Sequence, residues 1–365
     1  MSMQKEWKGE VTVPSSWNVT SLEMASEDFP LERTNREIND CDAGQVADRI
    51  SDALRKLSIK AEYDGPNAKA KCQTQDLVSF RIRLYSGGVT GQPIIVEVQR
   101  RSGSTRSFMQ SCRAILAAAE GQSVDTNHNQ AKNHTRTVPP FLKSRPVGDL
   151  KCLQGANVPD VETSTNGALQ RVVELLGATK MDVQVLGLEN LACLTDPIQS
   201  APKCALMAAK AVFLPTEQVC VREDVCTVLA RCNEDDDSED DEARGVNLRE
   251  KSRHFCMLVF STSLSVMAQS GCLKECVESE QTWFVETLLP LLLGEVSDAA
   301  TGPNNAYLAV SGLKLLLCGV PRVTDKVSEL DGPAILRNAN EVGRQVHELL
   351  EKEAGKCLDR YESFL

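Results

Sequence analysis

The chain has 365 residues, with 40 Lys and Arg against 51 Asp and Glu, so its formal net charge is −11. Aromatic residues make up only 4% of the sequence, and no apolar run reaches the ~18 residues that a membrane span needs. With a charged amino-terminal segment and 14 Cys, this composition excludes membrane, collagen-like and disulfide-scaffold classes and predicts a cytoplasmic or nuclear protein with free thiols.

The charge is unevenly distributed along the chain. Residues 46–120 carry 12 basic and 7 acidic side chains, a net charge of +5, whereas residues 161–365 carry 19 basic and 32 acidic ones, a net charge of −13. Polar, turn-rich sequence flanks the basic region on both sides. We therefore expect four parts: a disordered acidic tail over 1–44, a first module over 45–120, a linker over 121–160 and a second module over 161–365.

The first module is predicted to be an α+β domain. Apolar residues recur at helical spacing over 45–57 and then alternate with polar residues in four successive segments. Ser104 or Thr105 can cap a closing helix, whose apolar residues again recur at helical spacing. This order predicts a helix, four antiparallel strands and a helix, with both helices covering the apolar face of the sheet.

The polar face of this predicted sheet is basic. Lys69 and Lys71 lie on one strand and Arg81 and Arg83 on the next, so pairing of these strands would bring four cations together. Like charges at opposite positions destabilise a sheet, which favours a binding role for the cluster. The alternative is that these side chains only keep the sheet soluble.

A family resemblance supports a binding role. The strand Val78–Tyr85, the segment Gln-Arg-Arg-Ser-Gly over 99–103, and Phe108 with Cys112 on the closing helix together resemble the kinase-associated C-terminal domain, which ends AMP-activated and MARK-type protein kinases. The resemblance covers 46–120 and implies binding of anionic phospholipids, or a docking or autoinhibitory role. The sequence contains no kinase catalytic loop of the form His-Arg-Asp. The lipid-facing candidates that the resemblance implies are Arg100, Arg101 and Arg106.

Helical spacing of apolar residues dominates the second module. The pattern Gly-Leu-x-x-Leu-x-Cys over 187–193 recurs over 312–318, and one third of this 125-residue offset, about 42 residues, is typical of armadillo or HEAT repeats. The stretch 168–194, a helix, a turn over 177–180 and a longer helix, resembles an armadillo repeat. The resemblance implies an all-α superhelical stack in which Asn190 hydrogen-bonds the backbone of an extended peptide.

An acidic loop is expected over 233–243 of the second module, since eight of the nine residues from 234 to 242 are Asp or Glu. Ser238 precedes three acidic residues, a pattern that acidophilic kinases accept, so it is a phosphorylation candidate. The alternative is an inert, solvated loop. Repulsion between this loop and phosphates argues against nucleic acid as a partner.

No catalytic, cofactor or metal motif stands out in the sequence. Cys220, Cys226 and Cys232 are spaced so that they would point in three directions on a helix, which does not suit a metal site. The sequence favours a non-enzymatic interaction or scaffold protein that docks on anionic lipid or a partner protein through the first module and binds proteins or peptides through the second. The alternative is a regulatory or targeting subunit of a protein kinase, with the kinase or a kinase subunit as its partner. A third hypothesis is an enzyme hidden in the helical module.

Overall fold

The computed structural model divides the chain into two compact units. The first unit consists of Met1–Val124, Gly294–Tyr307 and Pro333–Asp359. The second unit consists of Asp125–Leu293, Leu308–Gly332 and Arg360–Leu365. The residues that the structure describes are 16–25, 31–39, 41–87, 93–123, 161–215, 219–232, 242–317 and 321–363.

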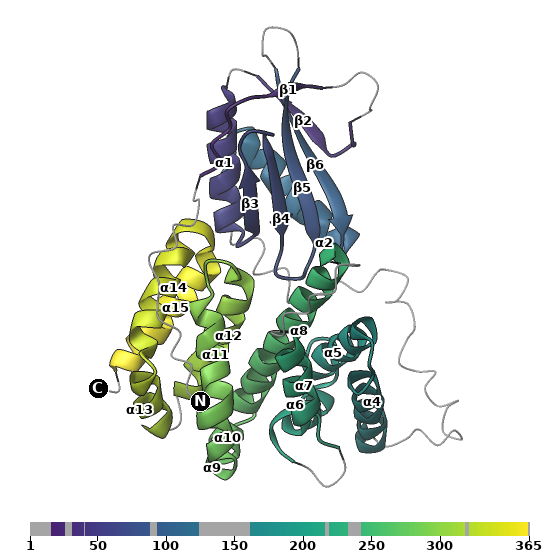
Figure 1. The fold of residues 1–365 in the computed structure, drawn as a ribbon, viewed down its shortest axis with the longest axis vertical. Helices are drawn as coiled ribbons and strands as arrows, with labels where there is room; N and C mark the ends of the chain where they lie inside the picture. Colours follow the sequence, from purple (N-terminus) through teal and green to yellow (C-terminus); the bar gives the residue numbers. More distant parts are fainter. Residues whose placement is uncertain are drawn as a thin grey trace, which may run out of the picture. The chain divides into compact units, whose positions relative to one another are not determined.

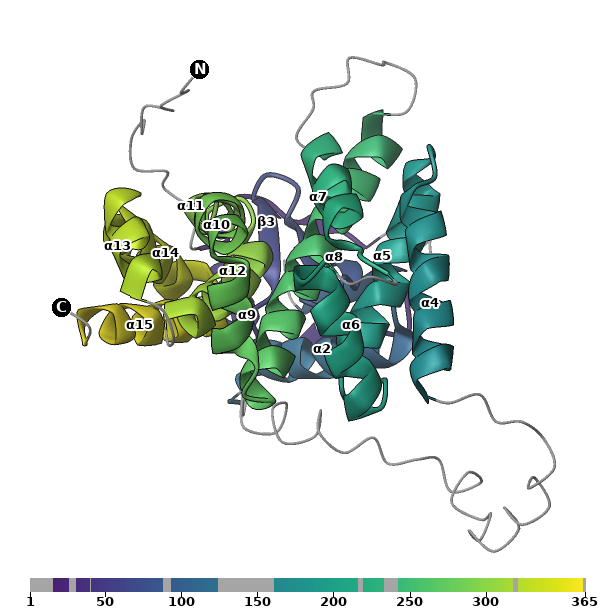
Figure 2. The same cartoon turned by 90° about the horizontal axis from the view of Figure 1, so that it is seen from below.

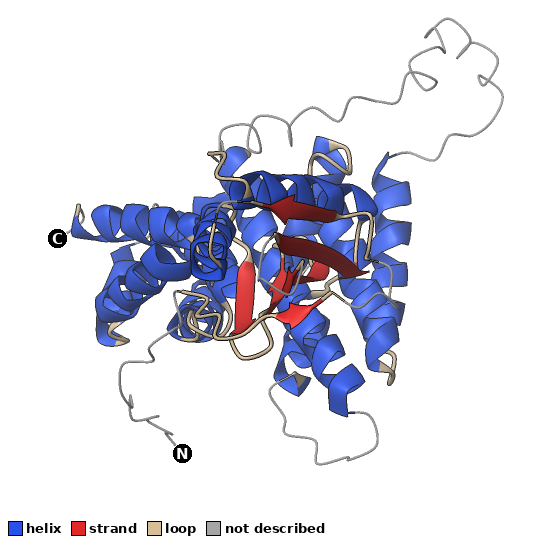
Figure 3. Ribbon diagram, turned by 90° about the horizontal axis from the view of Figure 1, so that it is seen from above, coloured by secondary structure: helices blue, strands red, loops and turns tan. Residues whose placement is uncertain are grey.

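A six-stranded sheet forms the centre of the first unit (Figure 1). The strand order is β2-β6-β5-β4-β3 with antiparallel neighbours, and β1 pairs in parallel with the end of β5. All strands of the described chain belong to this sheet, which is red in Figure 3. In chain order, the six strands and the two helices that accompany them are β1 (Glu23–Met24), β2 (Asn35–Ile38), α1 (Ala43–Lys56), β3 (Lys60–Asp64), β4 (Lys69–Gln73), β5 (Ser79–Ser86), β6 (Ile94–Ser102) and α2 (Thr105–Ala119).

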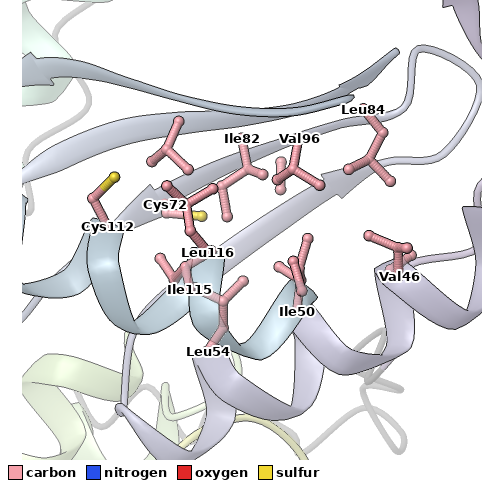
Figure 4. Close-up of a cluster of buried hydrophobic side chains, with 14 of the residues drawn as sticks. Val46, Ile50, Leu54, Cys72, Ile82, Leu84, Val96, Cys112, Ile115 and Leu116 are labelled. Carbon is pink, nitrogen blue, oxygen red and sulfur yellow. The ribbon is translucent and has the colours of Figure 1, made fainter. Parts of the chain in front are cut away.

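Helices α1 and α2 cover the same face of the sheet. Figure 4 shows their apolar side chains pointing at those of the strands, and Ile50, Ile82, Val96 and Ile115 in this cluster are all completely buried. Polar caps fix where the helices begin; for example, the Asp42 carboxylate accepts a hydrogen bond from the N–H of Gln45 at 2.8 Å. The predicted α+β module followed by a helical region is therefore confirmed.

The predicted tail is wrong for the described residues between 16 and 39. Trp17 is 1% exposed and its ring stacks on that of Tyr63 at 5.8 Å between centroids. Strand β2 pairs with β6, from Asn35 opposite Glu97 to Ile38 opposite Ile94. The sheet therefore has six strands rather than four. The sequence Asn-Arg-Glu-Ile of β2 has no apolar alternation, so its pairing with a strand some 60 residues later leaves no local signal.

Two segments from late in the chain, Gly294–Tyr307 and Pro333–Asp359, also belong to the first unit. Asn304, near the start of α12 (Pro303–Leu317), donates a hydrogen bond from Nδ2 to the carbonyl of Thr74 at 3.3 Å. Ser58 Oγ accepts one from the N–H of Leu349 at 2.9 Å, at the start of α15 (Glu348–Glu362). The predicted boundary, with all of 161–365 in one helical module, therefore differs from the observed division. Contacts across more than 200 residues are invisible to a search for local periodicity.

A neutral histidine connects these returning helices. His347 lies between α14 (Gly332–Val346) and α15, and its Nδ1 accepts a hydrogen bond from the N–H of Leu350 at 3.1 Å. Its Nε2 lies 3.1 Å from Oδ1 of Asn304, whose amide already donates to Thr74, so Nε2 carries the proton. Burial lowers the pKa of His347 to about 3. The imidazole therefore caps α15 in its uncharged form.

The second unit is helical. In it α5 and α6 lie along the long helix α8 (Figure 2). The predicted turn over 177–180 separates α4 from α5, as observed. A Cβ atom on Gly187 would lie 3.0 Å from Cβ of Leu175, and one on Gly312 would lie 3.1 Å from Cδ1 of Leu264, so both glycines of the repeated pattern allow helices to pack closely. The helices that lie wholly in the second unit are α4 (Val161–Leu176), α5 (Met181–Thr195), α6 (Pro202–Phe213), α7 (Arg222–Arg231), α8 (Glu242–Gln269), α9 (Leu273–Ser279), α10 (Gln281–Trp283), the π-helical turn η4 (Phe284–Leu288) and α13 (Pro321–Glu329). Two more helices are shared between the units: α11 (Leu289–Ser297) begins in the second unit and ends in the first, and α12 begins in the first unit and ends in the second.

Two sequence predictions fall where the structure is not described. Residues 124–160, most of the predicted linker, lie outside the described residues. So do 233–241 of the predicted acidic loop, including the phosphorylation candidate Ser238. The last two residues of the predicted loop, 242 and 243, belong to α8.

Candidate functional site

The predicted cluster of cations forms on the outer face of the sheet. In the pairing of β4 with β5, Lys69 lies opposite Arg83 and Lys71 lies opposite Arg81. Because alternate residues of a strand share a face, all four side chains project from the face opposite the buried cluster. The predicted juxtaposition is confirmed, while the binding role of these residues stays a prediction.

A β-bulge adds a fifth cation to this face. Ser79 of β5 pairs with Ser102 of β6, but Phe80 pairs with Arg100, so Arg101 is the extra residue between them. Desolvation first, and then the charges of Arg101 and Arg83, lower the pKa of Arg81, which places the Arg101 charge close to it. We refer to these five residues as the basic face: Lys69, Lys71, Arg81, Arg83 and Arg101.

Two members of the basic face form no ion pair, although Asp64 lies opposite Lys69 in the pairing of β3 with β4 and its charge offsets part of the repulsion. Neither Lys69 nor Arg81 forms an ion pair with a carboxylate among the described residues. Partial desolvation, followed by the charges of Arg81 and Arg83, lowers the pKa of Lys69 below its usual range. The cations thus repel one another, and a bound anion would relieve this repulsion.

Arg83 is held more firmly than its neighbours. Its Nη1 donates to the hydroxyl of Tyr85 at 3.3 Å, and this hydrogen bond, together with the nearby Glu97 charge, raises the pKa of Arg83. Glu97 is only 2% exposed and accepts hydrogen bonds from the N–H of Glu32 at 2.7 Å and from Nε2 of Gln99 at 2.8 Å. Buried Glu97 therefore anchors one side of the basic face. The sequence shows Glu97 as an acid between valines but gives no sign of this role.

The opposite side of the basic face carries weak ion pairs. Glu62 on β3 lies 3.8 Å from Nζ of Lys71 and 3.9 Å from Nζ of Lys60. Glu62 and Lys71 are both largely exposed, so solvent screens this attraction. Lys71 is therefore available to an incoming anion at little cost.

Two cations implied by the family resemblance lie apart from this cluster. Arg100 donates from Nη1 to the carbonyl of Gly103 at 2.8 Å, where the chain turns into α2. Arg106 is exposed in the first turn of α2. No described contact brings either side chain to the basic face, whereas Arg101 belongs to it.

The peptide-binding candidate Asn190 lies on the solvent side of α5. Leu186, Asn190 and Cys193 are all exposed and are spaced to share one helix face, with Leu186 49% exposed. Ile198, shortly after the end of α5, is 55% exposed. The face of α5 that carries the predicted Asn thus also presents apolar surface. Its role in peptide binding stays a prediction.

Three further features of the described residues concern metal binding, cysteine reactivity and membrane-spanning helices. The described part of the chain contains no group of three or more His, Cys, Asp or Glu side chains that could hold a metal ion. Burial raises the pKa of the Cys226 and Cys276 thiols to about 11, which disfavours the reactive thiolate. No single described helix is long and apolar enough to cross a membrane; only the bent pair Leu248–Gln269 and Leu273–Ser279 meets the criteria of length and composition.

Comparison with known proteins identifies no relative of this chain. No protein-family model, no curated protein and no solved structure matches it. The resemblances to the kinase-associated domain and to armadillo repeats are thus predictions that rest on the residues quoted for them.

Proposed function

We propose that this protein is a non-enzymatic docking protein whose α+β unit binds anionic phospholipid membranes through the basic face. The observation that supports this proposal is the cross-strand pairing of Lys69 with Arg83 and of Lys71 with Arg81. A sheet that brings like charges into register loses stability by doing so. A partner that carries negative charge offsets this loss.

The energetics suit reversible attachment. Each Lys or Arg close to an anionic leaflet contributes about 1 kcal/mol, so the five residues of the basic face supply enough attraction for a peripheral protein. Salt weakens this attraction, because the exposed charges are screened within about 10 Å at moderate ionic strength. Binding should therefore depend on both lipid charge and salt.

Co-sedimentation of the full chain with vesicles tests this proposal. The protein should pellet with vesicles that contain phosphatidylserine and remain in the supernatant with neutral phosphatidylcholine vesicles. The double variant Lys69→Ala/Arg81→Ala should bind the anionic vesicles about 30-fold more weakly, since two contributions of about 1 kcal/mol are lost.

A matched control separates local from overall charge. Arg113→Ala removes one exposed cation from α2, which covers the opposite face of the sheet, and should leave binding nearly unchanged. Equal binding to neutral and anionic vesicles would refute the proposal, as would an equal loss per charge at Arg113 and at the basic face.

A second binding activity is favoured by the exposed face of α5. We infer that the helical unit, as an armadillo-like stack, binds an extended peptide along Leu186, Asn190 and Cys193. The support is the combination of an amide that can pair with a peptide backbone and an exposed leucine one turn away. Screening a library of displayed peptides against the full chain, and against the variant Asn190→Ala/Leu186→Ser, tests this inference. Peptides that bind both proteins equally would place the site elsewhere.

A further inference from the structure

One edge of the sheet in the first unit is a regular strand. Strand β3, with the sequence Lys-Ala-Glu-Tyr-Asp over 60–64, is last in the strand order. Proteins protect such edges with prolines, bulges or inward-pointing charges. Strand β3 contains no proline, its register with β4 has no irregularity, and its inward-facing residues are Ala61 and Tyr63.

The hydrogen-bond alternation of the sheet shows which backbone groups of β3 are open. The N–H of Leu84 donates to the carbonyl of Ala68, and the N–H of Thr74 donates to that of Val78, so even-numbered residues of β4 bond with β5. Odd-numbered residues of β4 therefore bond with Lys60, Glu62 and Asp64 of β3. The N–H and C=O groups of Ala61 and Tyr63 then point away from the sheet, and no described residue hydrogen-bonds to them.

The charges of β3 are self-complementary. If a second copy of β3 pairs antiparallel with Ala61 opposite Tyr63, four backbone hydrogen bonds form, and Lys60 lies opposite Asp64 of the second copy at both ends. Glu62 then faces its own counterpart, but each Glu62 is already near the amino groups of Lys60 and Lys71. A shift of two residues in one direction would oppose Glu62 to Asp64. A shift in the other direction would require Ile59 to pair with Tyr63 of the second copy. The N–H of Ile59 already donates to the carbonyl of Leu54 at 2.9 Å, so it is not available for this pairing.

We propose that the protein self-associates through the β3 edge, so that two sheets join across a two-fold axis. Such an interface is isologous, because the same strand serves both partners. A five-residue strand buries little surface, so the association should be weak and in rapid equilibrium. The axis of an antiparallel strand pair is perpendicular to the sheet, so both outer faces lie on the same side. The dimer would therefore present two basic faces to one partner surface and gain avidity.

Analytical ultracentrifugation of the full chain, without vesicles, tests this proposal independently of lipid binding. Over roughly 1 to 200 µM, a range chosen for weak interfaces, the weight-average mass should rise from 39.9 kDa toward twice that value. Lys60→Glu opposes two acids at each end of the strand pair and should weaken association at least tenfold. Glu62→Gln removes the repulsion at the two-fold axis and should strengthen association.

Two further variants complete the test. Glu37→Gln makes the same substitution on β2, the other edge strand, and should leave the mass curve unchanged. Ala61→Pro removes one outward-facing N–H donor and should also weaken the dimer. If circular dichroism shows that this variant is misfolded, the Lys60 and Glu62 variants alone test whether the β3 edge forms the dimer interface. A monomer at every concentration would overturn the proposal, and so would a dimer that Lys60→Glu and Glu62→Gln leave unaltered.

Discussion

The two faces of the six-stranded sheet use the same strands for different tasks. On β5, Phe80, Ile82 and Leu84 are 2% exposed or less and pack in the core, whereas Arg81 and Arg83 lie between them on the polar face. The side-chain period of two lets adjacent residues serve folding and binding separately. Substitutions one residue apart should therefore affect different properties of the protein.

The largest expected effect is a loss of stability that occurs on the buried face of the sheet and not on the polar face. Ile82→Ala leaves a cavity among fully buried side chains and should lower the free energy of unfolding by about 2 to 5 kcal/mol. Arg81→Ala should change it by less than about 0.5 kcal/mol, because it removes a repulsive surface charge. Urea denaturation of both variants measures the difference. Similar losses of stability would show that Arg81 has a structural role on the polar face.

Lowering the pH should reduce the free energy of unfolding through the buried His347 rather than through the basic face. The folded-state pKa of His347 is about 3, below its usual value near 6.5, so the unfolded chain binds the extra proton between these values. Stability from this group is complete above pH 6.5 and falls as the pH drops toward 3, with a loss of about 2 kcal/mol at pH 5 relative to pH 8. His347→Gln, compared with the parent by urea denaturation at both pH values, should show that much less acid sensitivity. Parallel losses in the two proteins would contradict a buried neutral imidazole.

Glycines extend the comparison of packed and open faces to the helices. A Cβ on Gly187 would press against Leu175 and Leu176, whereas one on Gly167 would meet nothing within 4 Å. Both substitutions with Ala gain helix propensity, but only the first overpacks a helix contact. Gly167→Ala should stabilise the protein by about 0.5 to 1 kcal/mol, and Gly187→Ala should destabilise it by about 1 kcal/mol. Thermal unfolding of the pair tests this, and equal shifts would show that α4 and α5 can move apart freely.

The smallest effect is expected at the exposed face of α5. Asn190→Ala should change the free energy of unfolding by less than about 0.5 kcal/mol, because the side chain is solvated. Its neighbour Leu191 is completely buried, so Leu191→Ala should cost about 2 to 5 kcal/mol. Calorimetry of the two variants makes the comparison. A large loss at Asn190 would mark it as a structural residue and remove it as a peptide-binding candidate.

Local patterns predicted much of the α+β unit. Alternation of residues over β4 and β5 was sufficient to predict that Lys69 and Lys71 lie close to Arg81 and Arg83, whereas the register that sets Lys69 opposite Arg83 comes from the structure. The helical periods and the turn before Met181 were likewise sufficient for α1, α2, α4 and α5.

The features that the sequence did not predict depend on contacts between residues far apart in the chain. Trp17 stood alone in a polar segment, and its burial against Tyr63 depends on a strand that comes some 40 residues later. His347 lies in an ordinary helical stretch, and its role depends on its burial and on its contacts with Asn304 and with the N–H of Leu350. The bulge at Arg101 and the anchoring of Arg83 by Glu97 depend on three-dimensional pairing, which composition and periodicity do not encode.

The contact between Ser58 and Leu349 has a consequence for biosynthesis. The two residues are 291 positions apart, and a ribosome adds roughly 5 to 20 residues per second, so Ser58 waits about 15 to 60 s for its partner. All six strands leave the ribosome long before that. The nascent chain can thus carry a complete sheet while α15 is still untranslated. A message truncated near its 3′ end would yield a protein that retains the basic face and lacks the helix that Ser58 and His347 cap.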